Sequence, residues 1–208
     1  MEITGIVLAG GQCSRMGQDK ALVRIGGKRL IEHSLAVLGQ FCDSILISTH
    51  NPALGNWGYR IVADEYHGIG PIAGLYSALK ASQSRHTLVI PCDTPYVDAV
   101  VYERLLDSAD DCLAVIAGTV DGLKEPLIGY YDRSVAEILR QQIQEGDYML
   151  QHALERMDAR IEVFSDTKRF VNINAPSDLH FCLSAAYEGH HGEPSELSIQ
   201  EVGIESIL

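Results

Sequence analysis

The segment between residues 8 and 20, with the sequence LAGGQCSRMGQDK, combines the residue types that bind a polyphosphate. It follows a buried-strand pattern at residues 3–9, and its glycines let the backbone turn tightly and point several N–H groups at one place. These glycines are Gly10, Gly11 and Gly17. Arg15 and Lys20 could neutralise the same phosphates. The spacing differs from that of a Walker A loop and of a dinucleotide fingerprint. The alternative is a tight strand-to-helix turn with incidental charges, and the clustering favours phosphate binding.

Two aspartates stand at the expected carboxyl ends of strands, where open α/β sheets bind their ligands. Asp64 ends a strand at 59–63, and Asp93 follows a strand at 86–90. Pro95 biases the residue before it toward an extended conformation, so Asp93 lies on a stiff segment. A carboxylate beside a polyphosphate suits Mg²⁺, which takes one or two protein oxygens and adds phosphate oxygens. Asp93 is therefore the predicted magnesium ligand, whereas a lone aspartate after a strand is more often a helix cap.

Two further segments could contact a ligand. Residues 70–74, with the sequence GPIAG, open a predicted helix with small side chains that would permit close approach of a ligand, although an ordinary packed helix N-terminus explains them equally well. In the extended segment 170–176, period-two alternation puts Asn172 and Asn174 on one face. Two amides on one face could bind a polar ring system such as a pterin, but asparagines beside a proline are also common turn formers.

The elements that must position these residues follow from the hydrophobic pattern. Apolar runs alternate with helix-period segments, which indicates βαβ units and a largely parallel sheet. Strands are expected at 3–9, 44–48, 59–63, 86–90, 113–118, 124–131 and 160–164, and helices at 29–40, 71–82, 98–108, 135–144, 149–157 and from about 176. The turn signal Asp121-Gly122 predicts that 124–131 returns antiparallel to 113–118. We expect one α/β domain over residues 1–187 and a flexible acidic tail over residues 188–208.

Composition excludes several functional classes. The net charge of −12 disfavours binding of nucleic acid. Residues 1–30 nevertheless hold five basic and two acidic residues, so an anionic ligand is expected there. No long apolar run or secretory pattern occurs, which predicts a cytoplasmic protein without a membrane span. The five cysteines form no C-x-x-C pair, which argues against a disulfide framework or a structural zinc site.

Taken together, these motifs resemble the molybdenum cofactor guanylyltransferases, the family that joins GMP from GTP to molybdopterin. The resemblance extends from residue 3 to about residue 179 and is most specific at 8–20. It implies a Rossmann-like three-layer nucleotidyltransferase fold. It also implies roles for individual residues: Leu8, Ala9, Gly10 and Gly11 in binding the nucleotide, Lys20 at the phosphates, Asp64 at the nucleoside, Asp93 at magnesium and nucleotide, and Asn172 and Asn174 on the molybdopterin side.

The sequence departs from the family at two positions. Ser48 occupies a position that is often asparagine, and Asp147 lies where relatives often carry basic residues. The expected reaction is attack of the molybdopterin phosphate on the α-phosphorus of GTP, with Arg15, Lys20 and Asp93 as its catalytic residues. The expected partners are GTP and molybdopterin, and molybdoenzymes or other cofactor-biosynthesis proteins are the candidate protein partners. The alternatives are transfer of CMP, a sugar-phosphate acceptor, or a carrier that performs no chemistry.

Overall fold

A seven-stranded sheet forms the centre of the computed structural model, which describes residues 1–10 and 19–174. In chain order its strands are β1 (Ile3–Leu8), β4 (Ser44–Ser48), β5 (Arg60–Val62), β6 (His86–Pro91), β7 (Ala114–Thr119), β8 (Lys124–Asp132) and β9 (Arg160–Phe164). Their order across the sheet is β5-β4-β1-β6-β8-β7-β9. All neighbouring strands are parallel except β8, which runs antiparallel to both β6 and β7. The expected antiparallel insertion is confirmed, and it lies inside the sheet.

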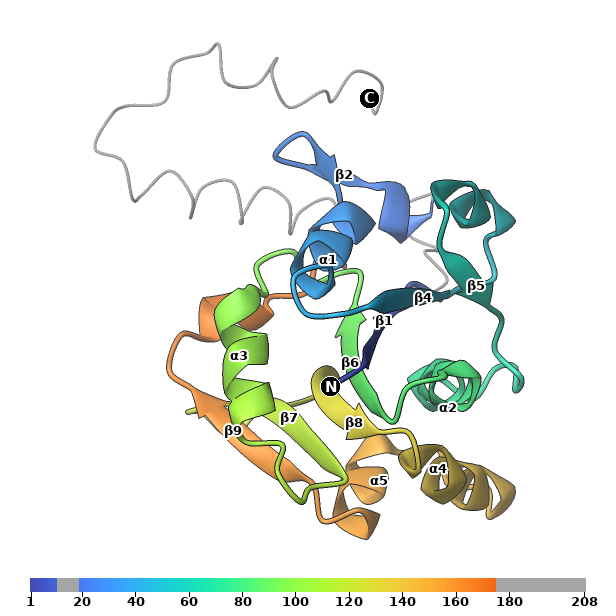
Figure 1. Ribbon diagram of the computed structural model, residues 1–208, viewed down its shortest axis with the longest axis vertical. Coiled ribbons are helices and arrows are strands. Elements are labelled where there is room, and N and C mark those ends of the chain that lie inside the picture. The colour runs from blue at the N-terminus through green and yellow to red at the C-terminus, as the bar shows by residue number, and fades with distance from the viewer. Residues whose placement is uncertain (11–18, 175–208) are drawn as a thin grey trace.

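Within the described residues, five α-helices cover the two faces of the sheet (Figure 1). They are α1 (Leu30–Leu38), α2 (Pro71–Ala81), α3 (Ala99–Asp107), α4 (Val135–Gln144) and α5 (Leu150–Arg156). Alternate strand residues point to opposite faces, so Val7 packs in a core with α1 and α3, whereas Ile6 packs in a second core with α2, α4 and α5. The expected three-layer α/β fold is therefore confirmed. In the described part of the chain no helix is long and apolar enough to cross a membrane.

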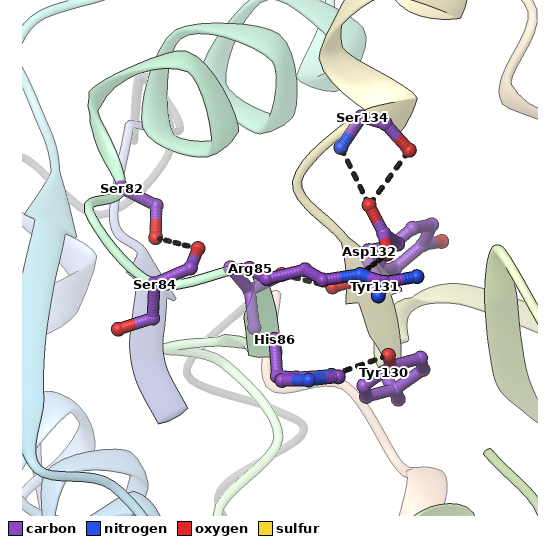
Figure 2. Close-up of polar contacts among 9 residues, drawn as sticks. Ser82, Ser84, Arg85, His86, Tyr130, Tyr131, Asp132 and Ser134 are labelled. Atoms are coloured by element: carbon purple, nitrogen blue, oxygen red, sulfur yellow. Dashed lines mark hydrogen bonds and ion pairs between the residues drawn. The ribbon is translucent and has the colours of Figure 1, made fainter. Parts of the chain in front are cut away.

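The antiparallel strand β8 is fastened to the start of β6 by a polar cluster (Figure 2). Arg85 Nε donates to one carboxylate oxygen of Asp132 at 2.6 Å, and the backbone N–H and hydroxyl of Ser134 donate to the other at 2.8 and 2.6 Å. Nδ1 of His86, the first residue of β6, lies 2.8 Å from the hydroxyl of Tyr130, which is two residues before Asp132 on β8. Asp132 is only 4% exposed. These contacts hold β8 against β6, with the other end of β8 directed to the carboxyl edge of the parallel strands.

Several local features differ from the sequence prediction. A short hairpin of β2 (Arg24–Ile25) and β3 (Lys28–Arg29) precedes α1, with two glycines of positive φ at its turn. The 3-10 helices η1 (Lys20–Leu22), η2 (Pro52–Trp57) and η3 (Thr167–Phe170) were also not predicted. The expected extended segment therefore begins only after Phe170. The predicted helix near 176 and the tail lie outside the described residues, so both stay predictions.

Candidate active site

The main cleft, of about 1220 Å³, opens at the carboxyl ends of β1, β4, β5 and β6. It is lined by Leu8, Ala9, Gly10, Asp19, Lys20, Ser48, Thr49, His50, Asn51, Asp64, Tyr66, His67, Gly68, Gly70, Pro71, Gly74, Pro91, Cys92, Asp93 and Leu127. Parallel strands end at the same edge of a sheet, which is why residues distant in sequence meet there. Of the residues predicted to bind the nucleotide, Leu8, Ala9, Gly10, Lys20, Asp64 and Asp93 all line this cleft.

Lys20 joins two of the predicted segments. Its Nζ lies 2.7 Å from Oδ2 of Asp93 and donates to Oδ1 of Asn174, also at 2.7 Å. The side chains of Lys20 and Asp93 are 13% and 23% exposed, so this ion pair is largely shielded from solvent. The N–H of Ile173 donates to the carbonyl of Asp93 at 2.9 Å and fixes the segment that carries Asn174. Two oxygen atoms from distant parts of the chain thus converge on one cation.

Asp19 holds Lys20 in place and was not singled out from the sequence. It is the N-cap of η1, and its Oδ1 accepts the N–H of Ala21 at 3.0 Å. Its other oxygen accepts a hydrogen bond from the side chain of Asn51, which follows β4. The glycine-rich segment is therefore tied to the end of β4 directly before Lys20. An aspartate before a short helical turn is a recognisable cap signal, but its partner could not be read from the sequence.

Asp64 lies at the opposite wall of the main cleft. Ser48 Oγ donates to its Oδ1 at 3.0 Å, and Nε2 of His50 lies 3.4 Å from its Oδ2. The serine at the position where the family often has asparagine thus contacts Asp64. A Cβ built on Gly74 would lie 3.0 Å from Ser48 Oγ and 3.3 Å from Asp64 Oδ1, which explains the small residue at this point of α2.

At the end of β1, the backbone N–H and carbonyl of Ala9 already form hydrogen bonds within the protein. The N–H of Ala9 donates to the carbonyl of Ser48 at 2.8 Å, and the carbonyl of Ala9 accepts the hydroxyl of Thr49 at 3.1 Å. Both groups therefore hold β1 against β4, and Ala9 presents other atoms to the main cleft. The neighbouring predicted residues Gly11 and Arg15 lie outside the described part of the chain.

The two predicted asparagines differ in their contacts. Both are exposed while Ile173 between them is buried, so the expected alternation is observed. Ile173 packs in a small core with Val23, Ile25 and Leu30. Asn174 reaches Lys20, whereas Asn172 does not line the main cleft in the described part of the protein.

Glu125, near the start of β8, is a carboxyl group that was not predicted from the sequence. Burial and the negative charge of Asp93 raise the pKa of Glu125 to about 7. The negative charge of Asp93 thus acts on a second carboxyl group, at the start of β8. This effect depends on the insertion of β8 beside β6, and no short motif in the sequence signals it.

Comparison with known proteins places these features in a family. Residues 5–161 match the model of the MobA-like NTP transferase domain. A probable molybdenum cofactor guanylyltransferase of Halalkalibacterium halodurans is 35% identical, over 84% of this chain and 94% of that protein. A molybdenum cofactor guanylyltransferase of Shewanella frigidimarina is 33% identical, over 84% of this chain and 92% of that protein.

Solved structures agree with this assignment. The molybdopterin-guanine dinucleotide biosynthesis protein A of Archaeoglobus fulgidus superposes with a TM-score of 0.73 at 27% identity, over 89% of this chain and 99% of that one. A CMP:2-keto-3-deoxy-manno-octonic acid synthetase shares the fold alone, with a TM-score of 0.70 at 14% identity. The chain belongs to the MobA-like NTP transferase family.

Proposed function

We propose that this protein is a molybdenum cofactor guanylyltransferase, which transfers GMP from GTP to molybdopterin and releases pyrophosphate. Relatives that bear this name match the chain over more than nine-tenths of their own length. The observation that carries the proposal is that Lys20, Asp64 and Asp93 line one cleft at the carboxyl edge of the sheet. A cation and two carboxylates at separate points of the cleft suit a ligand with a polyphosphate at one end and a hydrogen-bond donor at the other.

In this proposal the nucleotide lies between β1 and α2. Leu8, Ala9, Gly10 and Gly11 lie along the guanosine, and Asp64 accepts a hydrogen bond from the nucleoside. Its carboxylate is oriented for this task because Ser48 donates to one oxygen. Lys20 and Arg15 neutralise the phosphates. Asn172 and Asn174 face the molybdopterin, and the contact of Asn174 with Lys20 supports an acceptor that lies next to the phosphates.

The oxygen atoms around Lys20 are of the kind that bind magnesium. Asp93 and the amide oxygen of Asn174 already hold one cationic group between them at 2.7 Å each. Magnesium prefers oxygen ligands and takes only one or two from the protein when phosphates supply the others. The described residues contain no group of three or more histidine, cysteine or acidic side chains able to hold a metal. Asp93 would hold the ion, which when bound neutralises charge on the phosphate oxygens.

The reaction needs positioning and charge neutralisation from the protein. A phosphate oxygen of molybdopterin forms a bond to the α-phosphorus of GTP while the bond from that phosphorus to the bridging oxygen breaks. The electron pair leaves with pyrophosphate, whose negative charge Lys20 and Arg15 stabilise. The nucleophile is already an anion, so no covalent enzyme intermediate is required. Asp64 keeps the nucleoside fixed so that the attacking and leaving oxygens stay in line.

Pyrophosphate release tests this proposal. The protein is incubated with Mg²⁺ and a molybdopterin-bearing acceptor, together with either GTP or CTP. We expect release with GTP that depends on the acceptor, and formation of a guanine dinucleotide product detected by mass spectrometry. Release with CTP alone would contradict the guanylyl assignment. Binding of nucleotide without release of pyrophosphate in either case would support a carrier instead.

A further inference from the structure

Two histidine rings pack together in the lining of the main cleft. His50 follows β4 and His67 follows β5, and these two strands are neighbours in the sheet (Figure 1). The ring centroids are 5.4 Å apart, with 48° between the ring planes. Both residues line the main cleft and both are exposed, so a bound ligand can reach them. The proposed reaction gives neither ring a task.

His50 lies beside the carboxylate that binds the nucleoside in the proposed function. Its Nε2 is 3.4 Å from Oδ2 of Asp64, whereas Oδ1 of Asp64 accepts the hydroxyl of Ser48 at 3.0 Å. The backbone of Gly10 approaches the same Oδ2, since a Cβ built on this glycine would lie 3.7 Å from it. A nucleoside that donates a hydrogen bond to Oδ2 therefore lies next to both Gly10 and the ring of His50.

The chemistry of an exposed imidazole in this place suits a nucleobase. Bases are flat, and proteins commonly bind them by stacking aromatic side chains, histidine included, on their faces. The side chain of His50 is 46% exposed, and it is in contact with Asp64 on β5's following loop and with the ring of His67. A ring that is already held in place loses less conformational freedom when a ligand binds.

We propose that His50 stacks on the base of the bound nucleotide and that His67 positions the ring of His50. This inference rests on the proposed function, in which Asp64 binds the nucleoside. Asp64 then accepts a hydrogen bond from the nucleoside, while the ring of His50 covers a face of the base. His67 acts only through its contact with His50, so it is a positioning residue.

Titration calorimetry with two ligands tests the contact with the base. His50→Ala should raise the Kd for GTP with Mg²⁺ by about 5- to 100-fold, the usual loss when an aromatic partner of a base is removed. Inorganic tripolyphosphate carries similar charge but no base, so His50→Ala should bind it as tightly as the unaltered protein does. An unchanged Kd for GTP, or an equal loss for both ligands, would overturn the inference.

His152→Ala is the matched control. The side chain of His152 is 54% exposed and lies 2.9 Å from a carboxylate oxygen of Asp147, much as His50 lies beside Asp64. It belongs to α5 and is not part of the lining of the main cleft. Its removal should leave the Kd for GTP unchanged. All these histidines are exposed, so the variants should keep the Tm of the unaltered protein, which thermal unfolding checks.

Two further variants separate stacking from hydrogen bonding to Asp64. His50→Phe keeps a flat ring and loses both ring nitrogens, whereas His50→Gln keeps a donor and loses the ring. Stacking predicts that His50→Phe binds GTP nearly as tightly as the unaltered protein and that His50→Gln is as weak as His50→Ala. Any other pattern would overturn the inference. If His50→Ala proved unstable, His50→Gln would provide the same loss of the ring.

A double-mutant cycle tests the role of His67. His67→Ala should weaken binding of GTP by a smaller factor than His50→Ala, because the ring of His50 is then less well held. In a protein that already carries His50→Ala, the same change should have no further effect, since coupled residues are not additive. Full additivity of the two losses would show that His67 does not act through His50, and would overturn its positioning role.

Failure of this inference can be told from failure of the proposed function. If GTP yields the guanine dinucleotide product and His50→Ala binds GTP normally, only the stacking inference fails. If CTP proves to be the substrate, the guanylyl assignment fails, and His50→Ala should then weaken binding of CTP. If neither nucleotide binds, the proposed function and the inference fail together.

Discussion

The helical glycine Gly74 offers a way to move Asp64 without altering it. In the interior of a helix, replacing glycine by alanine usually stabilises a protein by about 1 kcal/mol. At Gly74 the new methyl group would lie 3.0 Å from Ser48 Oγ and 3.3 Å from Asp64 Oδ1. Both atoms belong to the hydrogen bond that orients Asp64. Gly74→Ala should therefore displace this pair by a few tenths of an ångström.

The expected magnitudes follow from two opposing effects. Overpacking a tight site costs about 1–3 kcal/mol, which offsets the helix gain and leaves a net destabilisation of about 0–2 kcal/mol. For a chain of this size that corresponds to a decrease in Tm of at most about 8 °C. A hydrogen bond from the nucleoside to the displaced carboxylate is worth about 1.5–3 kcal/mol. Losing it should raise the Kd for GTP by about 10- to 100-fold.

Thermal unfolding and isothermal titration with GTP and Mg²⁺ measure the two effects separately. Gly55→Ala is the matched control, because a Cβ on Gly55 would meet only Ile61 Cγ1 at 3.6 Å, an ordinary contact. We expect the control to bind GTP normally and to unfold within about 0.5 kcal/mol of the unaltered protein. If Gly74→Ala bound GTP within twofold of the unaltered protein, the role assigned to the Ser48 and Asp64 pair would be refuted.

Two further predictions concern charged residues. Lys20→Ala removes the cation that pairs with Asp93. It should reduce the rate of pyrophosphate release by about 10²- to 10³-fold, as does the loss of one hydrogen-bond donor to a developing negative charge in other enzymes. An unchanged rate would mean that Lys20 has only a structural role. Burial alone would raise the pKa of Asp132, but the hydrogen bonds from Ser134 and Arg85 outweigh it and hold the pKa below its usual value. A depressed pKa stabilises the fold above the unfolded-state pKa of about 4, and this contribution is lost as the pH falls below it. Asp132→Asn should thus lower the free energy of unfolding by about 1–3 kcal/mol at pH 7 and by clearly less at pH 3.5. Denaturant titrations at the two pH values measure this difference. An equal loss of stability at both pH values would contradict the prediction.

The nucleotide side of the site was largely predictable from the sequence. Strand and helix periodicities are local properties of the chain, and they predicted the strands that end near Leu8, Asp64 and Asp93. Parallel strands linked by helices place their carboxyl ends at one edge of the sheet, so the meeting of these residues followed from their positions along the pattern. The small residue at 74 and the alternation around Ile173 were also visible in the sequence.

The tertiary structure alone decided where β8 lies and what Lys20 contacts. A turn signal predicted that β8 pairs with β7, but no local pattern indicates that β8 also pairs with β6, the strand that leads to Asp93. Asn174 meets Lys20 across 154 residues of sequence for the same reason. Periodicity reports which face of an element is buried, whereas sheet order and long-range polar contacts depend on which surfaces fit together once the whole chain has folded.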